Sequence, residues 1–328
     1  MAARSSTSLA TSLADRFKAE RRRYRKRLER GQREFSEKAV HDLRVETRRR
    51  MALLDVLLAL QFPGPIKKLR KVFKKRLDAF DELRDTHVQL LMLKPLCQEF
   101  PEARELDALL CRRARRLTNE LSKEARATKH VRWERRLKIV EEELRGSTGK
   151  MAGEATRLAI LAALRAAFDH VVALRRRIRP DRTATIHRTR VAFKCFRYMC
   201  ELLGPYLPEL RAEDLGRMRE YQAMMGNIQD VVALLVGVRR AVAEKEISGR
   251  AIGPLRRELL RRRRELIDIY LAAADRLFDF EPSAAAAKVG ASVVPGDGVI
   301  PPHLADSPTH PVMSNSRSTK PNEGNPRP

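Results

Sequence analysis

One motif occurs twice in this chain, and the distance between the two copies divides the sequence into halves. VHDLRVETRRRMALLDVLL begins at Val40, and IHRTRVAFKCFRYMCELL begins at Ile186. An offset of 146 residues aligns His41 with His187 and Arg44 with Arg190. Downstream, an offset of 145 aligns residues 77–91 with residues 222–236. An internal repeat of this kind predicts two similar halves, which divide near residues 145–153.

The repeated segments read as helices. Apolar residues recur at intervals of three and four, and no segment alternates polar and apolar residues over a convincing length. Helix breakers gather at residues 62–65, 101, 146–153, 180, 204–205 and 253–254. We therefore predict an all-α protein in which each half is a helical bundle.

The composition changes at residue 281. Residues 281–328 hold nine of the seventeen prolines and show no periodicity, so we expect a disordered Pro-rich tail. Its basic and acidic residues balance, and the net charge of +26 therefore belongs to residues 1–280. The chain has 68 Lys and Arg against 42 Asp and Glu, and this excess of basic residues predicts a polyanionic partner: nucleic acid, an acidic membrane surface or inorganic polyphosphate.

The cysteines and the apolar segments indicate a cellular compartment. Cys97, Cys111, Cys195 and Cys200 form no CxxC pair and no metal-ligand spacing, which favours a reduced cytosol and no metal. No run of 18 apolar residues occurs, so we expect neither export nor a transmembrane segment. A cytoplasmic protein is the expectation.

The repeated basic residues fall on one stripe of their helix. Taking His41 as zero and about 100° per residue, Arg44 lies at roughly 300° and Arg48 at roughly 340°. Apolar residues flank the stripe on both sides, whereas a solvated face lies opposite the apolar arc. Such a stripe predicts an interior groove that faces an anion, because buried cations need a partner. Four repeated acids are expected to be structural partners that orient the basic side chains: Asp55, Asp85, Glu201 and Asp230.

The paired HxxRV motifs, each followed some forty residues later by a leucine-rich helix ending in RD or QD, resemble the CHAD family, the conserved histidine α-helical domain. The resemblance covers about residues 10–280, with half-repeats at about 10–148 and 150–280. It implies two pseudo-symmetric four-helix bundles that enclose a basic cleft for inorganic polyphosphate. The binding residues it implies are His41, Arg44, Arg48, His187, Arg190, Lys194 and Arg197, with Lys74 and Arg219 on the following helices.

This chain departs from the family pattern at a glycine position. The family often has glycine near the end of the second helix of each half; Gly226 fits, but Asp81 stands there in the first half. Arg48-Arg49-Arg50 matches the family's paired arginines, and Arg49 is a secondary candidate. Further secondary candidates, for which a solvated helix face is an equal interpretation, are Arg112, Arg116, Arg257 and Arg261. No triphosphate-tunnel motif is present, so the chain resembles a stand-alone member.

The chemistry of the partner also follows from residue types. Polyphosphate has charge but no bases, so Arg, Lys and imidazole donors along a track suffice to bind it. Aromatic residues make up only 5% of the chain, and they fall at core-like positions rather than on base-stacking platforms. Nonspecific nucleic-acid binding is the alternative. A phosphohydrolase or phosphotransfer role is disfavoured, since neither a phosphate loop nor a carboxylate cluster for Mg²⁺ occurs, and we expect no cofactor and no catalytic residue. Association with polyphosphate or storage granules is a further expectation. The repeat also predicts that His41 with Arg44 and His187 with Arg190 contribute comparably to affinity.

Overall fold

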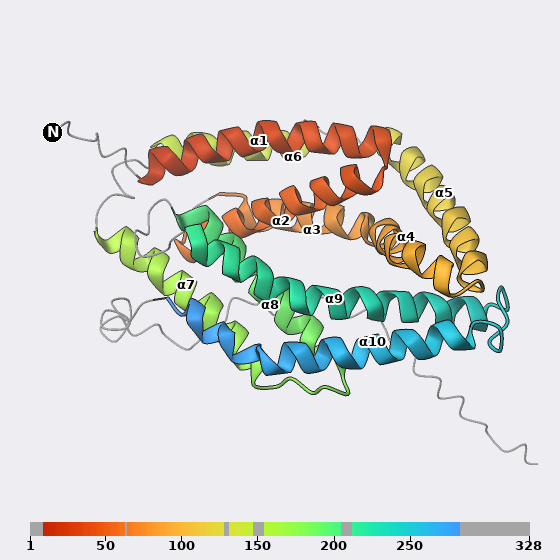
Figure 1. Cartoon of the computed structure of the whole chain (residues 1–328). Coiled ribbons are helices and arrows are strands. Elements are labelled where there is room, and N and C mark those ends of the chain that lie inside the picture. The colour runs from red at the N-terminus through yellow and green to blue at the C-terminus, as the bar shows by residue number, and fades with distance from the viewer. Residues whose placement is uncertain (1–8, 63, 128–130, 147–153, 205–211, 283–328) are drawn as a thin grey trace, which may run out of the picture. The chain divides into compact units, whose positions relative to one another are not determined.

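A computed structural model describes residues 9–62, 64–127, 131–146, 154–204 and 212–282 (Figure 1). In these ranges the chain forms α-helices and one 3₁₀ helix but no strand, which confirms the all-α class. The elements are α1 (Leu9–Glu34), α2 (Glu37–Ala59), α3 (Ile66–Ala79), α4 (Asp81–Glu99), α5 (Ala103–Ala127), α6 (Val131–Gly146), α7 (Glu154–Arg175), α8 (Thr183–Leu203), α9 (Ala212–Ala243), α10 (Gly253–Ala272) and the 3₁₀ helix η2 (Ala274–Phe280). The predicted disorder of the tail and the predicted division near 145–153 lie largely outside the described residues.

Local sequence explains where the first repeated helix begins. The Ser36 side chain accepts a hydrogen bond from the Ala39 amide at 3.3 Å, and Glu37 lies in the first turn of α2. An oxygen-bearing cap and an early acid both stabilise a helix N-terminus. This start sets the rotation of α2, and with it the direction of the His41 and Arg44 side chains.

The two halves match in element order but differ at one break. Helices α2 and α8 carry the two copies of the motif, and α9 corresponds to α3 and α4 together. In the first half the helix is interrupted at Phe80, which ends α3 and precedes α4 with φ −100° and ψ 5°. In the second half α9 continues through the equivalent point, where Gly226 lies.

The halves do not have separate hydrophobic cores. One cluster of buried side chains includes Leu53 and Leu54 of α2 together with Phe193 and Phe196 of α8. A second cluster joins α4 and α5 of the first half to α9 and α10 of the second through Leu93, Leu106, Leu234 and Leu255. Figure 1 shows α4 beside α9, with α5 packed on α4 and α10 packed on α9. Each half therefore depends on the other for burial of its apolar faces.

Two further features bear on the packing and on the surroundings of the chain. Gly237 of α9 lies against Gln89 of α4, so that an added Cβ would stand 2.8 Å from Gln89 Oε1. Gln89 is buried, and its Nε2 donates to the Ala233 carbonyl oxygen at 3.0 Å. Among the described residues, no helix has the length and apolar content needed to cross a membrane.

Candidate anion-binding site

Contact between α2 and α8 brings basic side chains of both halves together. We call the following five residues the basic cluster: Arg44 and Arg48 of α2, and Arg190, Lys194 and Arg197 of α8. Burial lowers the pKa of Lys194 well below 10.5, and the neighbouring charges of Arg48, Arg190, Arg197 and Arg44 lower it further. The stripes predicted on two separate helices thus act on one another in the folded chain.

Arg48 and Arg190 of the cluster also have lowered pKa values. Burial first, and the Arg44 charge second, lower the pKa of Arg48 to about 10, from 12.5. Burial also lowers the pKa of Arg190, which the nearby Asp230 carboxylate partly offsets. In the described part of the chain, Arg48, Arg190 and Lys194 form no ion pair within 4.0 Å. A group of half-buried cations with this little compensation is a site for an anion.

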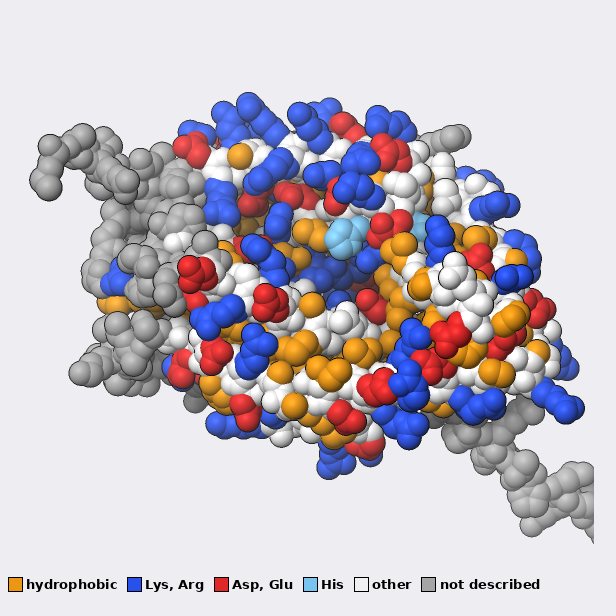
Figure 2. Space-filling model, in the orientation of Figure 1, with side chains coloured by type: hydrophobic (Ala, Val, Ile, Leu, Met, Phe, Trp, Pro, Cys, Tyr) orange, Lys and Arg blue, Asp and Glu red, His pale blue; other side chains and the backbone are white. Residues whose placement is uncertain are grey.

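One face of the molecule is hollowed, and basic side chains lie in the hollow (Figure 2). Figure 2 shows a depression between the regions of α2 and α4 above and α9 below, with Lys and Arg side chains at its base and a histidine at its rim. His41 is exposed, and its pKa is lowered by partial desolvation and then by Arg84. His187 is half-buried on α8.

Glu201, one of the repeated acids of the second half, forms ion pairs with several arginines. Arg197 donates from Nη1 to Glu201 and from Nε to Gln222 Oε1 at 2.9 Å, and its guanidinium lies 4.4 Å from the Tyr198 ring centroid. Arg49 and Arg219 approach Glu201 at 3.6 Å and 3.7 Å. Arg197 is therefore largely engaged by protein groups, whereas Arg219 is exposed beside it.

The run Arg48-Arg49-Arg50 sends its three side chains to three places. Arg48 joins the basic cluster and Arg49 reaches Glu201, as described above. Arg50 is fully buried, with its guanidinium 5.2 Å from the Tyr24 ring centroid and 5.8 Å from that of Phe73. Arg50 therefore belongs to the core and not to the anion site.

The remaining predicted acids take different positions. Asp55 is buried and pairs with Arg70 at 2.5 Å, and it accepts a weak hydrogen bond from the Cys195 thiol at 3.8 Å. Asp230 is half-buried, and desolvation raises its pKa against the opposing charges of Arg190 and then Arg84. Asp85 is exposed and has only a weak effect on Arg190. Asp230 is thus the acid with the largest effect on the charge of Arg190.

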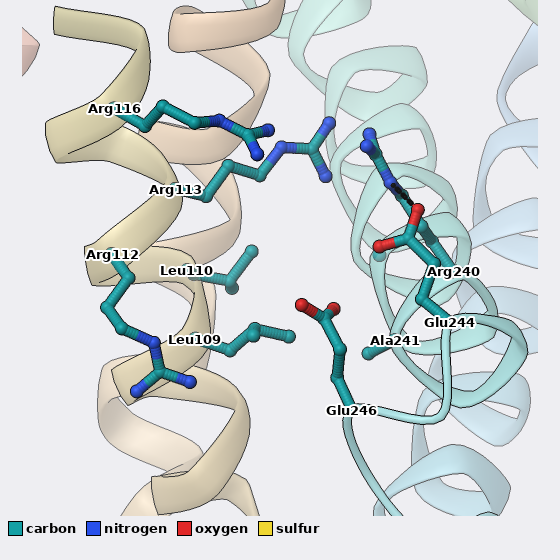
Figure 3. A pocket seen from close by; sticks show the side chains of 10 residues that line it. Leu109, Leu110, Arg112, Arg113, Arg116, Arg240, Ala241, Glu244 and Glu246 are labelled. Carbon is teal, nitrogen blue, oxygen red and sulfur yellow. Dashed lines mark hydrogen bonds and ion pairs between the residues drawn. The ribbon is translucent and has the colours of Figure 1, made fainter. Parts of the chain in front are cut away.

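Several other candidates contact groups outside the cluster or lie exposed. Lys74 pairs with Asp78 at 2.7 Å on its own helix. Arg112 and Arg116 of α5 line a cavity of about 260 Å³ together with Arg113, Arg240, Glu244 and Glu246 (Figure 3). On α10, Arg257 is exposed, and Arg261 pairs with Glu258 at 2.7 Å. The cavity shares no lining residue with the basic cluster, and its Arg240 pairs with Glu244, as the dashed contact in Figure 3 shows.

Sequence reasoning missed Arg84. This residue of α4 is half-buried and donates to Glu37 Oε1 at 2.6 Å, and its charge acts on His41, Arg190 and Asp230. The aligned residue in the second half is Gln229, so the repeat itself drew no attention to the position. The sequence feature that could have identified Arg84 is the difference between Arg84-Asp85 in the first half and Gln229-Asp230 in the second.

The comparisons with known proteins agree with this architecture. The chain is similar to the crystal structure of the CHAD domain from the plant Ricinus communis, with a TM-score of 0.62 and 18% sequence identity over 81% of this chain and 92% of that one. No curated protein matches the sequence. The family model for the CHAD domain matches residues 15–236, which is more than half of the chain. The protein therefore belongs to the CHAD domain family.

Proposed function

We propose that the chain binds inorganic polyphosphate at the basic cluster. The observation that carries the proposal is the convergence of five cationic side chains from two halves, three of which have no ion pair among the described residues. Desolvated cations of like charge raise the free energy of the empty site. A bound polyanion would relieve that repulsion, and it would gain charge-assisted hydrogen bonds from guanidinium and ammonium groups.

A polymer of phosphates fits this site better than a nucleic acid does. The donors lie on two adjacent helices, and polyphosphate needs only cations along its path. Reading or stacking of bases would require accessible aromatic rings. Phe73, Phe193 and Tyr221 are fully buried and pack edge-on against other rings in the core, as in the contact of 4.9 Å between the Phe193 and Tyr221 ring centroids.

The proposed role is binding rather than catalysis. We further propose that the protein is cytoplasmic and uses the site for targeting or scaffolding at polyphosphate-containing granules. Further contacts with the polymer are proposed around the basic cluster, from His41, His187, Lys74, Arg84 and Arg219. Arg49 is proposed to act indirectly, because it pairs with Glu201, which also pairs with Arg197 of the cluster.

Titration calorimetry with long-chain polyphosphate at physiological salt tests the proposal. In the full-length chain, Arg44, Arg48, Arg190 and Lys194 are changed to Ala together. Since each lost phosphate contact costs on the order of 1 kcal/mol or more, the affinity is expected to fall by at least a hundredfold, that is, by about 3 kcal/mol or more.

A matched variant carries four alanines at exposed basic positions outside the cluster: Arg22, Lys26, Arg257 and Arg264. It has the same net charge as the cluster variant, and its affinity should fall only slightly. DNA and RNA of equal charge are titrated in parallel. Equal losses in the two variants, or equal affinity for every polyanion, would mean that a diffuse basic surface is responsible and that the alternative of nonspecific nucleic-acid binding holds.

A further inference from the structure

The two arginines that the repeat aligns have unlike surroundings. Arg44 donates from Nη1 to the Leu77 carbonyl oxygen at 2.6 Å, and the same nitrogen lies 2.5 Å from Asp81 Oδ1. Its counterpart Arg190 forms no ion pair in the described part of the chain, and its buried Nε has no hydrogen-bond partner there. One arginine is therefore paired with a carboxylate in direct contact, whereas the other has only the more distant charge of Asp230.

The break between α3 and α4 explains this difference. Because the helix stops at Phe80, the Leu77 carbonyl at the end of α3 is available to Arg44, and Asp81 opens α4 beside it. In the second half α9 is continuous, and Gly226 stands where the repeat has Asp81. A Cβ at Gly226 would lie 3.7 Å from Arg190 Nε, so a carboxylate there would reach the guanidinium. The glycine leaves Arg190 open.

We propose that Asp81 is an internal counterion that withdraws Arg44 from anion binding, so that the second half dominates the affinity of the site. This inference rests on the proposed polyphosphate function. It replaces the expectation, drawn from the repeat, that Arg44 and Arg190 contribute comparably.

Competition for charge is the physical reason. An incoming phosphate must share Arg44 with a carboxylate that already contacts it, whereas Arg190 offers its charge without that competitor. Asp81 also acts on Arg48, since its charge opposes the lowering of the Arg48 pKa. About a third of the Asp81 side chain surface is exposed, so the carboxylate is at the edge of the site, where an anion would meet it.

Exchanging charge at the two aligned positions tests the inference, with affinity for long-chain polyphosphate measured on the full-length chain. Asp81→Asn keeps the side-chain shape and removes the charge, and its affinity should rise several-fold, up to about tenfold. Gly226→Asp places a carboxylate beside Arg190, and its affinity should fall by about tenfold or more. Gly226→Asn adds the same volume without the charge and reports the steric part of that loss. Circular dichroism and melting confirm that each variant is folded.

The outcomes separate this inference from the proposed function. Unchanged or weakened binding by Asp81→Asn, or equal losses for Gly226→Asp and Gly226→Asn, would overturn the counterion role while binding at the cluster stands. If the variant with four alanines in the basic cluster binds as tightly as the native chain, the proposed site fails, and the counterion role fails with it.

Discussion

At the scale of single residues, Lys194 is the most perturbed member of the basic cluster. Lys194 is half-buried, and desolvation is the first cause of its lowered pKa, ahead of the four arginines around it. The charged and titratable groups that face it are Arg44, Arg48 and His41 of α2, Arg190 and Arg197 of α8, and Asp230 of α9. A lysine in this state is charged only while the pH stays below its lowered pKa.

Polyphosphate affinity should therefore fall as the pH rises through the lowered pKa of Lys194. A bound phosphate favours the protonated amine, so binding is full below that pKa and weakens between it and the ordinary value of 10.5. Calorimetry over the alkaline range checks this, with Lys194→Arg as the control. The arginine variant should show a flatter profile until Arg48 titrates near its pKa of about 10. Parallel profiles for the two proteins would contradict the assignment.

At the scale of elements, the close approach of α4 and α9 joins the two halves. Gly237 allows it, because the buried Gln89 side chain occupies the space beside the glycine and donates to the Ala233 carbonyl. The break between α3 and α4 makes the two halves unlike. It allows the Arg44–Asp81 pair, which has no equivalent where α9 continues without a break. Helix continuity thus decides how each repeated arginine is used.

Gly237→Ala should destabilise the fold. Its Cβ would meet Gln89 Oε1 at 2.8 Å, and displacing a buried amide that is hydrogen-bonded to Ala233 should cost about 1–3 kcal/mol of unfolding free energy. Chemical denaturation measures this loss. Gly216→Ala in the same helix meets no atom within 4 Å and serves as the control, with equal or higher stability expected. A loss in the control as large as that at Gly237 would contradict the packing explanation, because helix propensity by itself favours alanine at both positions.

At the scale of the whole described domain, two opposing interactions meet where α2 contacts α8: apolar packing, which joins the halves, and repulsion between like charges. The shared core holds residues of both helices together, while the basic cluster sets positive charges against one another. Stability and binding therefore oppose one another at this contact.

Polyphosphate should stabilise the native chain against heat. A ligand at about 100 times its Kd adds about 2.7 kcal/mol, which corresponds to a rise in Tm of about 5 °C for a domain of this size. The variant with four alanines in the basic cluster should melt at an equal or higher temperature than the native chain without ligand, and it should show no shift with ligand. Scanning calorimetry measures both values. A similar shift in that variant would place the binding elsewhere.

The site could be predicted only in part because its residues are of two kinds. The stripe of Arg44, Arg48, Arg190 and Lys194 follows from helical periodicity and the repeat, which are local properties. The roles of Arg84, Asp81 and Arg50 do not, because each depends on groups from other helices: Glu37, Arg44 and the aromatic rings around Arg50.

The sequence alone determined the helical class, the repeat, the family and the faces on which the basic residues lie. Periodicity and motif spacing carry that information without any tertiary contact. Only the tertiary structure decided that the two stripes act on one another, that the halves share their cores and that Arg44 is paired while Arg190 is open. Those outcomes depend on where helices cross and where one of them breaks, and side chains far apart in sequence determine both.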